Sequence, residues 1–218
     1  MFLNVNGIDL YYECCGSGRP LIMLHGNGED HTIFDESFIK LNKFFQCFRI
    51  DSRGHGKSGK SKEYHYKDIA LDVVSFIECL DLRNVILYGF SDGGIAGLIA
   101  ACNNDRITSL IVSGANITPS GIKTFYRFNM RLDYYLHNDP RTRMMLYEPH
   151  IDDDTLKKIK ANTLVTAGSN DLIKAKETIH IAQTIKRARL VILEGENHGS
   201  YVIHSEKIAK IICDFVNQ

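Results

Sequence analysis

Short apolar runs alternate along the chain with longer segments in which apolar residues recur every three or four positions. The short runs are typical of strands buried in a sheet, and the longer segments are typical of helices that cover it. From residue 65 onward this pattern predicts helix 65–80, strand 85–89, helix 92–103, strand 107–113, strand 163–167, helix 174–186, strand 189–193 and helix 200–216. Strands that alternate with helices indicate an α/β fold with a mostly parallel sheet flanked by helices.

The first 60 residues predict further strands, beginning with an antiparallel hairpin. Residues 2–5 and 8–12 are strand-like and are joined by Asn6-Gly7, the pair that type I′ turns prefer. Residues 21–24 and 44–51 are also predicted strands. Functional side chains in such sheets gather beyond the carboxyl ends of the strands, and six polar residues follow predicted strands here: His25, Asp51, Ser91, Asn116, Asp171 and His198.

Residues 118–161 interrupt the alternation within what we expect to be one domain, residues 1–218. Aromatic, methionine and arginine residues are dense in this interval, which predicts short amphipathic helices forming an inserted cap. Their apolar faces either pack on the core or line a pocket, and Tyr126 and Phe128 are the candidate substrate contacts. The acidic triplet 152–154 precedes a helix-like stretch, so we interpret it as a solvated helix start rather than a metal site.

The composition limits the classes of partner. Lys plus Arg and Asp plus Glu both total 26, so the net charge of +0 favours neither nucleic acid nor a membrane as a partner. No apolar run is long enough to cross a membrane, and Met1-Phe2-Leu3-Asn4 does not begin a signal-like pattern, which together predict a cytoplasmic protein. Six cysteines without metal-ligand spacing predict reduced thiols and no metal site, and we expect no cofactor.

The segment Gly89-Phe90-Ser91-Asp92-Gly93 lies between a predicted strand and a predicted helix. A serine on such a corner, with a glycine on each side, is the pattern of a nucleophile elbow, in which the backbone is strained and the hydroxyl stands clear of the sheet. The amides that begin the following helix favour a developing negative charge nearby. The alternative interpretation is a glycine-lined turn in which the serine only caps the helix.

A serine hydroxyl becomes a useful nucleophile when a base accepts its proton and a carboxylate orients that base. In elbow-type hydrolases these groups follow in the order Ser, Asp or Glu, His. This chain offers Ser91, then Asp171 after the predicted strand 163–167 and His198 after the predicted strand 189–193. We predict that these three residues form a catalytic triad. The other histidines considered as the base are better interpreted as solvated or packed: His137, His150, His180 and His204.

Acyl transfer also needs donors for the oxyanion of the tetrahedral intermediate. We predict that the backbone N–H groups of Asn27 and Asp92 supply them, while His25 holds its loop by hydrogen bonds. The turn 51–58 contains glycines, a lysine and serines but lacks the spacing of a phosphate-binding loop. We interpret it as a structural loop pinned by Asp51 and Arg53.

Taken together, these motifs resemble those of the α/β-hydrolase fold family nearly from end to end. The resemblance rests on five segments in a fixed order: His25-Gly26-Asn27-Gly28, residues 51–58, Gly89-Phe90-Ser91-Asp92-Gly93-Gly94, residues 163–171 and Glu196-Asn197-His198. It implies an eight-stranded, mostly parallel sheet with a cap after the sixth strand. Two departures are that the inserted segment is short for such a cap, and that Asn162 stands where many relatives carry proline.

The residues around the elbow indicate which branches of the family this chain resembles. A serine at position 91 argues against the dehalogenase branch, which uses aspartate there. Ser91-Asp92-Gly93-Gly94 also resembles the elbow of amino-acid ester hydrolases, in which the acid after the serine meets the amino group of the substrate, and this implies that role for Asp92. The alternative is that Asp92 only complements the dipole of its helix.

The expected function is a serine hydrolase that cleaves a small carboxylic ester through an acyl-enzyme on Ser91. The same triad would serve a carbon–carbon bond hydrolase or a small-peptide amidase, so the partner expected is a small-molecule ester or amide. A ligand receptor that retains the fold without turnover is the alternative from a different class.

Overall fold

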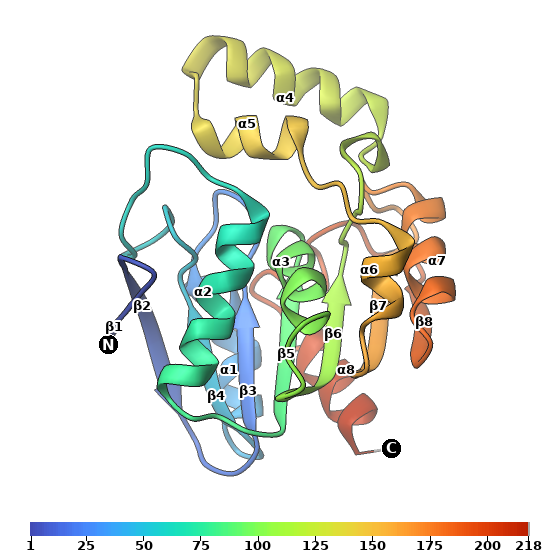
Figure 1. The fold of residues 1–218 in the computed structure, drawn as a ribbon. Coiled ribbons are helices and arrows are strands. Elements are labelled where there is room, and N and C mark those ends of the chain that lie inside the picture. Colours follow the sequence, from blue (N-terminus) through green and yellow to red (C-terminus); the bar gives the residue numbers. More distant parts are fainter. Residues whose placement is uncertain (218) are drawn as a thin grey trace.

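The computed structural model describes residues 1–217 and contains the eight-stranded sheet expected from the sequence (Figure 1). The strands lie in the order β1-β2-β4-β3-β5-β6-β7-β8. Their bounds are β1 Phe2–Val5, β2 Ile8–Cys15, β3 Pro20–Leu24, β4 Gln46–Ile50, β5 Val85–Phe90, β6 Ile107–Ser113, β7 Asn162–Gly168 and β8 Ala188–Leu193. All neighbouring pairs from β4 to β8 are parallel, whereas β2 runs antiparallel to β1 and β4.

The N-terminal hairpin follows its turn residues. Val5 pairs with Ile8, and the two residues between them, Asn6 and Gly7, have φ angles of 49° and 75°. Positive φ at both central positions is what a type I′ turn requires, and asparagine and glycine are the residues that adopt it most easily. The predicted antiparallel hairpin is therefore confirmed.

Helices cover both faces of the sheet, and each strand sends alternate residues to the two sides. Leu21 and Met23 pack with η1, α1 and α8, while Ile22 and Leu24 pack with α2 and α3. The bounds of the covering helices are η1 His31–Phe34, α1 Asp35–Leu41, α2 Tyr66–Cys79, α3 Asp92–Ala101, α6 Asp153–Lys157, α7 Ala175–Thr184 and α8 Lys207–Val216. The result is the α/β arrangement with helices on each face that the sequence predicted.

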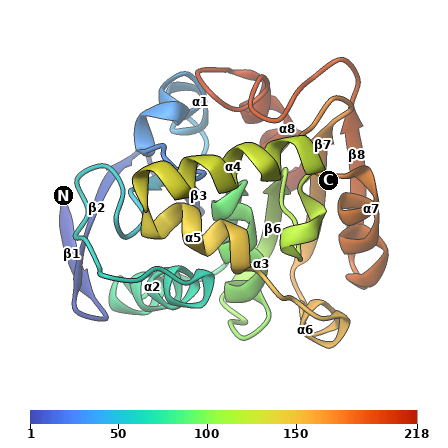
Figure 2. The ribbon, with the colours of Figure 1, turned by 90° about the horizontal axis from the view of Figure 1, so that it is seen from above.

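Within the interval 118–161, predicted to be an inserted cap, the short helix η2 Pro119–Gly121 precedes an α-helical hairpin, α4 Thr124–His137 and α5 Pro140–Tyr147. The end of the interval is not part of this hairpin, since α6 packs against α7. Figures 1 and 2 show that the hairpin lies over the carboxyl ends of the central parallel strands, with α4 farther from the sheet than α5. It therefore covers the edge at which the predicted functional residues meet.

One predicted helix begins later than expected. Residues 200–204 form turns, and the helix placed at 200–216 begins only at Lys207. The amides of Val202 and Ile203 both donate to the carbonyl of Gly199, and His204 donates its amide to Ile33 of a distant segment. His204 thus lies in a turn tied to another part of the chain, a long-range contact that the local apolar pattern could not reveal. Within the described residues, no helix is long and apolar enough to span a bilayer.

Candidate active site

Ser91 lies at the corner between β5 and α3, with the unusual backbone angles φ 53° and ψ −116°. This strain is held by close packing on both sides. A Cβ atom on Gly89 would lie 2.2 Å from the carbonyl oxygen of Gly93, and one on Gly93 would lie 2.4 Å from the carbonyl oxygen of Leu24. Only glycine fits at either position, so the chain crosses from strand to helix tightly enough to expose the serine hydroxyl.

The structure brings Ser91, His198 and Asp171 together. Ser91 Oγ lies 3.0 Å from His198 Nε2, and His198 Nδ1 lies 2.6 Å from Asp171 Oδ1. Asp171 is 3% exposed, and its Oδ1 also accepts a hydrogen bond from the amide of Ile173 at 2.9 Å. The three side chains come from the ends of β5, β7 and β8, so a continuous hydrogen-bonded path runs from a buried carboxylate to an accessible hydroxyl.

Close packing also fixes the imidazole from the side of β6. A Cβ atom on Gly114, which has φ +62°, would lie 2.7 Å from His198 Cε1. Phe90 stacks against the same ring at a centroid distance of 4.9 Å. Sequence reasoning missed both supports, since neither residue belongs to the local sequence around His198.

The two residues whose amides are predicted to hold an oxyanion, Asn27 and Asp92, lie near Ser91. Asp92 follows it in the chain, and a Cβ atom on Gly26, next to Asn27, would lie 3.1 Å from Ser91 Cβ. The carbonyl of His25 accepts a hydrogen bond from the amide of Gly93 at 3.1 Å, which fixes the end of β3 against the start of α3. Among residues 1–217, the amides of Asn27 and Asp92 have no hydrogen-bond acceptor. Both residues line the cavity above Ser91.

His25 is buried and holds its loop, as the sequence predicted. Its Nε2 accepts a hydrogen bond from the amide of Ser52 at 3.0 Å, and its Nδ1 lies 2.7 Å from the carbonyl oxygen of Gly26. Burial lowers the pKa of His25 to about 4, with a smaller contribution from the neighbouring His55. A histidine that is neutral and bonded through both nitrogens fixes the backbone beside Asn27 and is not available for proton transfer.

The turn 51–58 is a structural loop, as interpreted from its sequence. Asp51 accepts hydrogen bonds from the amides of His31 and Lys57, both at 2.8 Å. Arg53 forms a two-pronged ion pair with Asp72 of α2, both contacts at 2.6 Å. These contacts join the loop to η1 and α2.

A cavity of about 290 Å³ opens above Ser91. Its walls come from the loop that follows β3 (the β3 loop, residues 25–30), from the elbow at residues 89–93, from α2, from the cap, and from the loops that carry Asp171 and His198. The lining residues are Gly26, Asn27, Glu29, Tyr66, Phe90, Ser91, Asp92, Asn116, Ile122, Tyr126, Asn129, Met130, Met145, Leu172, Ile173 and His198. The size suits a small substrate.

The structure separates the two cap residues that were predicted to contact the substrate. Tyr126 lines the cavity, as do Asn129 and Met130 one turn further along α4. Phe128 does not line it, and its side chain is 65% exposed. The assignment of Phe128 is therefore wrong, because residues two apart on a helix point in nearly opposite directions.

Two carboxylates besides the triad line the cavity. Asp92 accepts hydrogen bonds from Tyr66 Oη at 2.8 Å and from Asn27 Nδ2 at 3.1 Å, yet burial outweighs these bonds and raises the pKa of Asp92 to about 6. Glu29 accepts a hydrogen bond from the amide of Gly26 at 2.9 Å, and burial raises its pKa as well. No lysine or arginine is among the lining residues, so the cavity is acidic.

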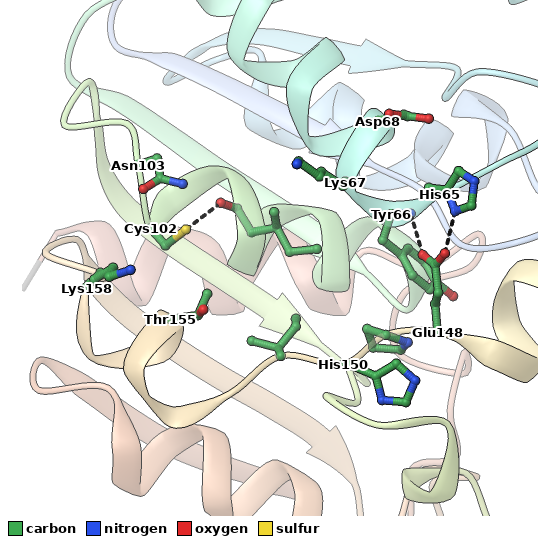
Figure 3. A pocket seen from close by; sticks show the side chains of 13 residues that line it. His65, Tyr66, Lys67, Asp68, Cys102, Asn103, Glu148, His150, Thr155 and Lys158 are labelled. Carbon is green, nitrogen blue, oxygen red and sulfur yellow. Dashed lines mark hydrogen bonds and ion pairs between the residues drawn. The ribbon is translucent and has the colours of Figure 1, made fainter.

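A larger cavity, about 630 Å³, lies on the other side of Tyr66, between α2, α3 and α6 (Figure 3). Glu148 closes one end of it, bonded to His65 Nδ1 at 2.5 Å and to the amide of Tyr66 at 3.1 Å. Cys102 and His150 lie toward opposite ends in Figure 3, and burial raises the pKa of the Cys102 thiol. This cavity therefore does not pair a nucleophile with a base.

One group of side chains within residues 1–217 has the geometry of a metal site: Asp30, His31 and Asp51. Its carboxylates already accept hydrogen bonds that shape the local backbone. Asp30 Oδ1 accepts from the amide and hydroxyl of Thr32, and Asp51 Oδ1 lies 2.7 Å from His31 Nδ1. These hydrogen bonds account for the close approach of the three side chains.

Residues 19–154 match the family model described as alpha/beta hydrolase fold, and this chain belongs to that family. The chain is 28% identical to AB hydrolase superfamily protein YisY of Bacillus subtilis, over 96% of each chain. It is 26% identical to Serine hydrolase BPHL of Homo sapiens, over 97% of this chain and 84% of that one. An esterase from Exiguobacterium antarcticum has the same fold, with a TM-score of 0.86 and 23% identity over 100% of this chain and 99% of that one. The family and these relatives support a hydrolase.

Proposed function

We propose that this protein is a serine hydrolase that cleaves small carboxylic esters through an acyl-enzyme on Ser91. The observation that carries the proposal is the hydrogen-bonded path from Asp171 through His198 to Ser91, with distances of 2.6 and 3.0 Å. A nucleophile, a base within reach of it and a carboxylate that orients the base are the three parts that acyl transfer requires.

In the first half-reaction, His198 Nε2 takes the proton of Ser91 as Oγ attacks the ester carbonyl carbon. The oxyanion that forms accepts hydrogen bonds from the amides of Asn27 and Asp92. His198 then donates its proton to the departing alcohol oxygen, the carbon–oxygen bond breaks, and the acyl group remains on Ser91. Asp171 stabilises the imidazolium throughout and holds the ring in the productive tautomer.

In the second half-reaction, water occupies the place of the alcohol. His198 takes a proton from it, the resulting hydroxide attacks the acyl carbon, and the same amides hold the second oxyanion. His198 returns the proton to Ser91 Oγ as the carboxylic acid leaves. No cofactor takes part in these steps.

The central test is the labelling and turnover of Ser91. A fluorophosphonate probe should label the native protein, and Ser91→Ala should abolish both labelling and hydrolysis of a short-chain p-nitrophenyl ester. Asp171→Asn should lower kcat by about 10³–10⁴-fold, because the amide favours the wrong imidazole tautomer. Ser120→Ala, at an exposed serine of the cap segment, is the matched control and should retain full activity. Undiminished turnover in Ser91→Ala would refute the proposal.

A panel of substrates separates the ester hydrolase from its alternatives. Small p-nitrophenyl esters should be turned over faster than peptide amides or carbon–carbon substrates of the β-diketone type. Faster cleavage of either other class by the same Ser91-dependent activity would replace the ester assignment. A protein that neither reacts with the probe nor turns over any of the three classes would be a ligand receptor instead.

The acidic cavity supports an amine-bearing substrate, with Asp92 and Tyr126 among its contacts. At pH 8 the Asp92 carboxyl is ionised, since its pKa is about 6, and can pair with an ammonium group. An alanine ester should therefore be preferred over the matching propionate ester. Asp92→Asn should remove that preference while both esters remain substrates; an unchanged preference would exclude Asp92 from recognition.

A further inference from the structure

The outward side of α4 is apolar and uncovered. None of its 14 residues is buried. The exposed apolar side chains recur at the spacing of one helix face, with exposed fractions of 70% for Phe125, 65% for Phe128, 50% for Leu132, 84% for Tyr135 and 63% for Leu136. Apolar side chains gathered on one face, rather than scattered singly, mark a surface that binds something.

The inward side of the same helix is already occupied. Tyr126, Asn129 and Met130 line the Ser91 cavity. The side of α4 that faces the protein is therefore a different one from the apolar side that faces outward. Figure 1 shows α4 as the outermost element of the molecule, above α5 and the ends of the strands. The helix therefore separates the cavity from whatever lies against its outer surface.

The charge around this face is positive although the whole chain is neutral. Residues 118–147 contain five basic side chains, at 123, 127, 131, 141 and 143, against two acidic ones, Asp133 and Asp139. Both acids are engaged, Asp133 with His137 at 2.9 Å and Asp139 with Arg141 at 2.6 Å. Net charge is a property of the whole chain, so it does not reveal an excess confined to one hairpin.

A groove beside the apolar face offers a place for an anion. It has a volume of about 600 Å³ and lies between α4 and α5, lined by Arg131, Tyr134, Tyr135, Asn138, Leu146 and Tyr147. Within residues 1–217, the guanidinium of Arg131 has no ion-pair or hydrogen-bond partner. An uncompensated guanidinium next to tyrosines suits a phosphate group at the boundary between water and an apolar phase.

We infer that the outward face of α4, with the Arg131 groove, binds the surface of an anionic phospholipid bilayer. The apolar side chains enter the boundary of the acyl chains while Arg131 meets the headgroup phosphates, so that the helix lies in the plane of the surface. A second copy of this chain is the weaker occupant, since a two-fold contact would place the same positive surface against itself. This differs from the expectation, drawn from net charge, of no membrane partner.

Vesicle flotation tests this without relying on any chemistry at Ser91. The protein should float with vesicles of phosphatidylcholine and phosphatidylglycerol in equal parts, and much less with phosphatidylcholine alone. Arg131→Glu should weaken the partition coefficient about tenfold, because it replaces an attraction by a repulsion. Phe128→Ser with Leu132→Ser should weaken it at least as much, since two apolar side chains no longer enter the boundary.

Two matched control variants test whether any loss of an exposed phenylalanine, or any reversal of an exposed arginine, would weaken vesicle binding in the same way. Phe44→Ser removes a phenylalanine that is also 65% exposed but lies outside the cap, and Arg83→Glu reverses an exposed arginine far along the chain from α4. Both should float like the native protein. Because no residue of α4 is buried, the surface variants should fold, which equal urea midpoints would show.

Three results would overturn the inference. These are equal flotation with neutral and anionic vesicles, surface variants that float like the controls, and a native dimer in sedimentation velocity that the Phe128→Ser/Leu132→Ser variant converts to monomer. The last result would assign the face to a second copy. If the protein floats as expected but hydrolyses no ester, the inference about the α4 surface stands and only the proposed function fails.

Discussion

In the proposed mechanism, Asp92 takes part through two different groups. Its amide is the first of α3, a position that the elbow motif fixes. Its side chain is held by Tyr66 of α2 and Asn27 of the β3 loop, 26 and 65 residues away along the chain. The amide could be predicted from local sequence, whereas the burial of the carboxylate depends on contacts that only the folded chain provides.

The raised pKa of Asp92 has a consequence for stability. In the folded protein the pKa is about 6 instead of 3.8, so the folded state binds the proton more tightly than the unfolded state. Ionisation on going from about pH 4 to pH 7 therefore costs stability. The Asp92→Asn variant lacks this cost. The difference in free energy of unfolding, variant minus native protein, should therefore rise by on the order of 2 kcal/mol between pH 4 and pH 7.

Urea unfolding at pH 4, 5, 6 and 7 measures this difference. Asp154→Asn, at a carboxylate that is 86% exposed, serves as the control and should give a nearly constant difference. A difference for Asp92→Asn that stays flat or falls with pH would show that burial does not penalise this charge.

At the scale of elements, the sequence predicted those features of helices and strands that depend on residues close together in the chain. The strands, the hairpin and the elbow follow from apolar runs and from glycines whose space is limited by adjacent segments. The start of α8 could not be predicted, because residues 200–204 are turned aside by the contact between His204 and Ile33. The same distinction explains why Gly114, which directly follows β6 and packs against His198, was missed.

Two glycines of α3 should respond to alanine in opposite ways. Gly93→Ala would place Cβ 2.4 Å from the carbonyl oxygen of Leu24, so β3 and α3 must separate. We expect a loss of about 3 kcal/mol in the free energy of unfolding. At Gly97 the nearest atom is Leu110 Cδ1 at 3.4 Å, and Gly97→Ala should gain about 0.5–1 kcal/mol from helix propensity. Urea denaturation compares the two, and equal effects would mean that the strand–helix contact can relax.

The two faces of α4 also make a paired prediction. Tyr126 lines the Ser91 cavity and Phe128 does not. Tyr126→Ala should therefore raise KM for a water-soluble short-chain ester about five- to tenfold, through lost apolar contact with the substrate. Phe128→Ala should leave KM within twofold. Steady-state kinetics on both variants tests the orientation of α4, and a larger change in KM for Phe128→Ala than for Tyr126→Ala would contradict it.

At the scale of the whole molecule, the site exists because parallel strands end at one edge. The sheet brings residues 27, 91, 171 and 198 together from four separate stretches of sequence. The rule that polar residues beyond strand ends converge gave six candidates, and the elbow motif with the chain order Ser, Asp, His reduced them to the three proposed triad residues. It could not select Glu29, whose carboxylate reaches the site by folding back onto the amide of Gly26.

The α4–α5 hairpin contributes only one buried side chain, Met144, to the cores that flank the sheet. No residue of α4 is buried, and Met144 is the buried residue of α5. Replacing residues 124–147 by a flexible Gly-Ser linker should therefore lower the free energy of unfolding by only about 2 kcal/mol, roughly the value of one buried methionine. Labelling of Ser91 by a fluorophosphonate should persist, because the triad lies entirely outside the hairpin.

Substrate binding should respond differently from stability in that shortened chain. Tyr126, Asn129, Met130 and Met145 form one wall of the cavity, so their removal should raise KM for a small ester while leaving kcat within a few-fold. The Ser91→Ala version of the shortened chain supplies the background rate. Loss of a cooperative urea transition would instead make the hairpin part of the folded core. A cooperative fold with unlabelled Ser91 would mean that the hairpin positions the nucleophile rather than the substrate.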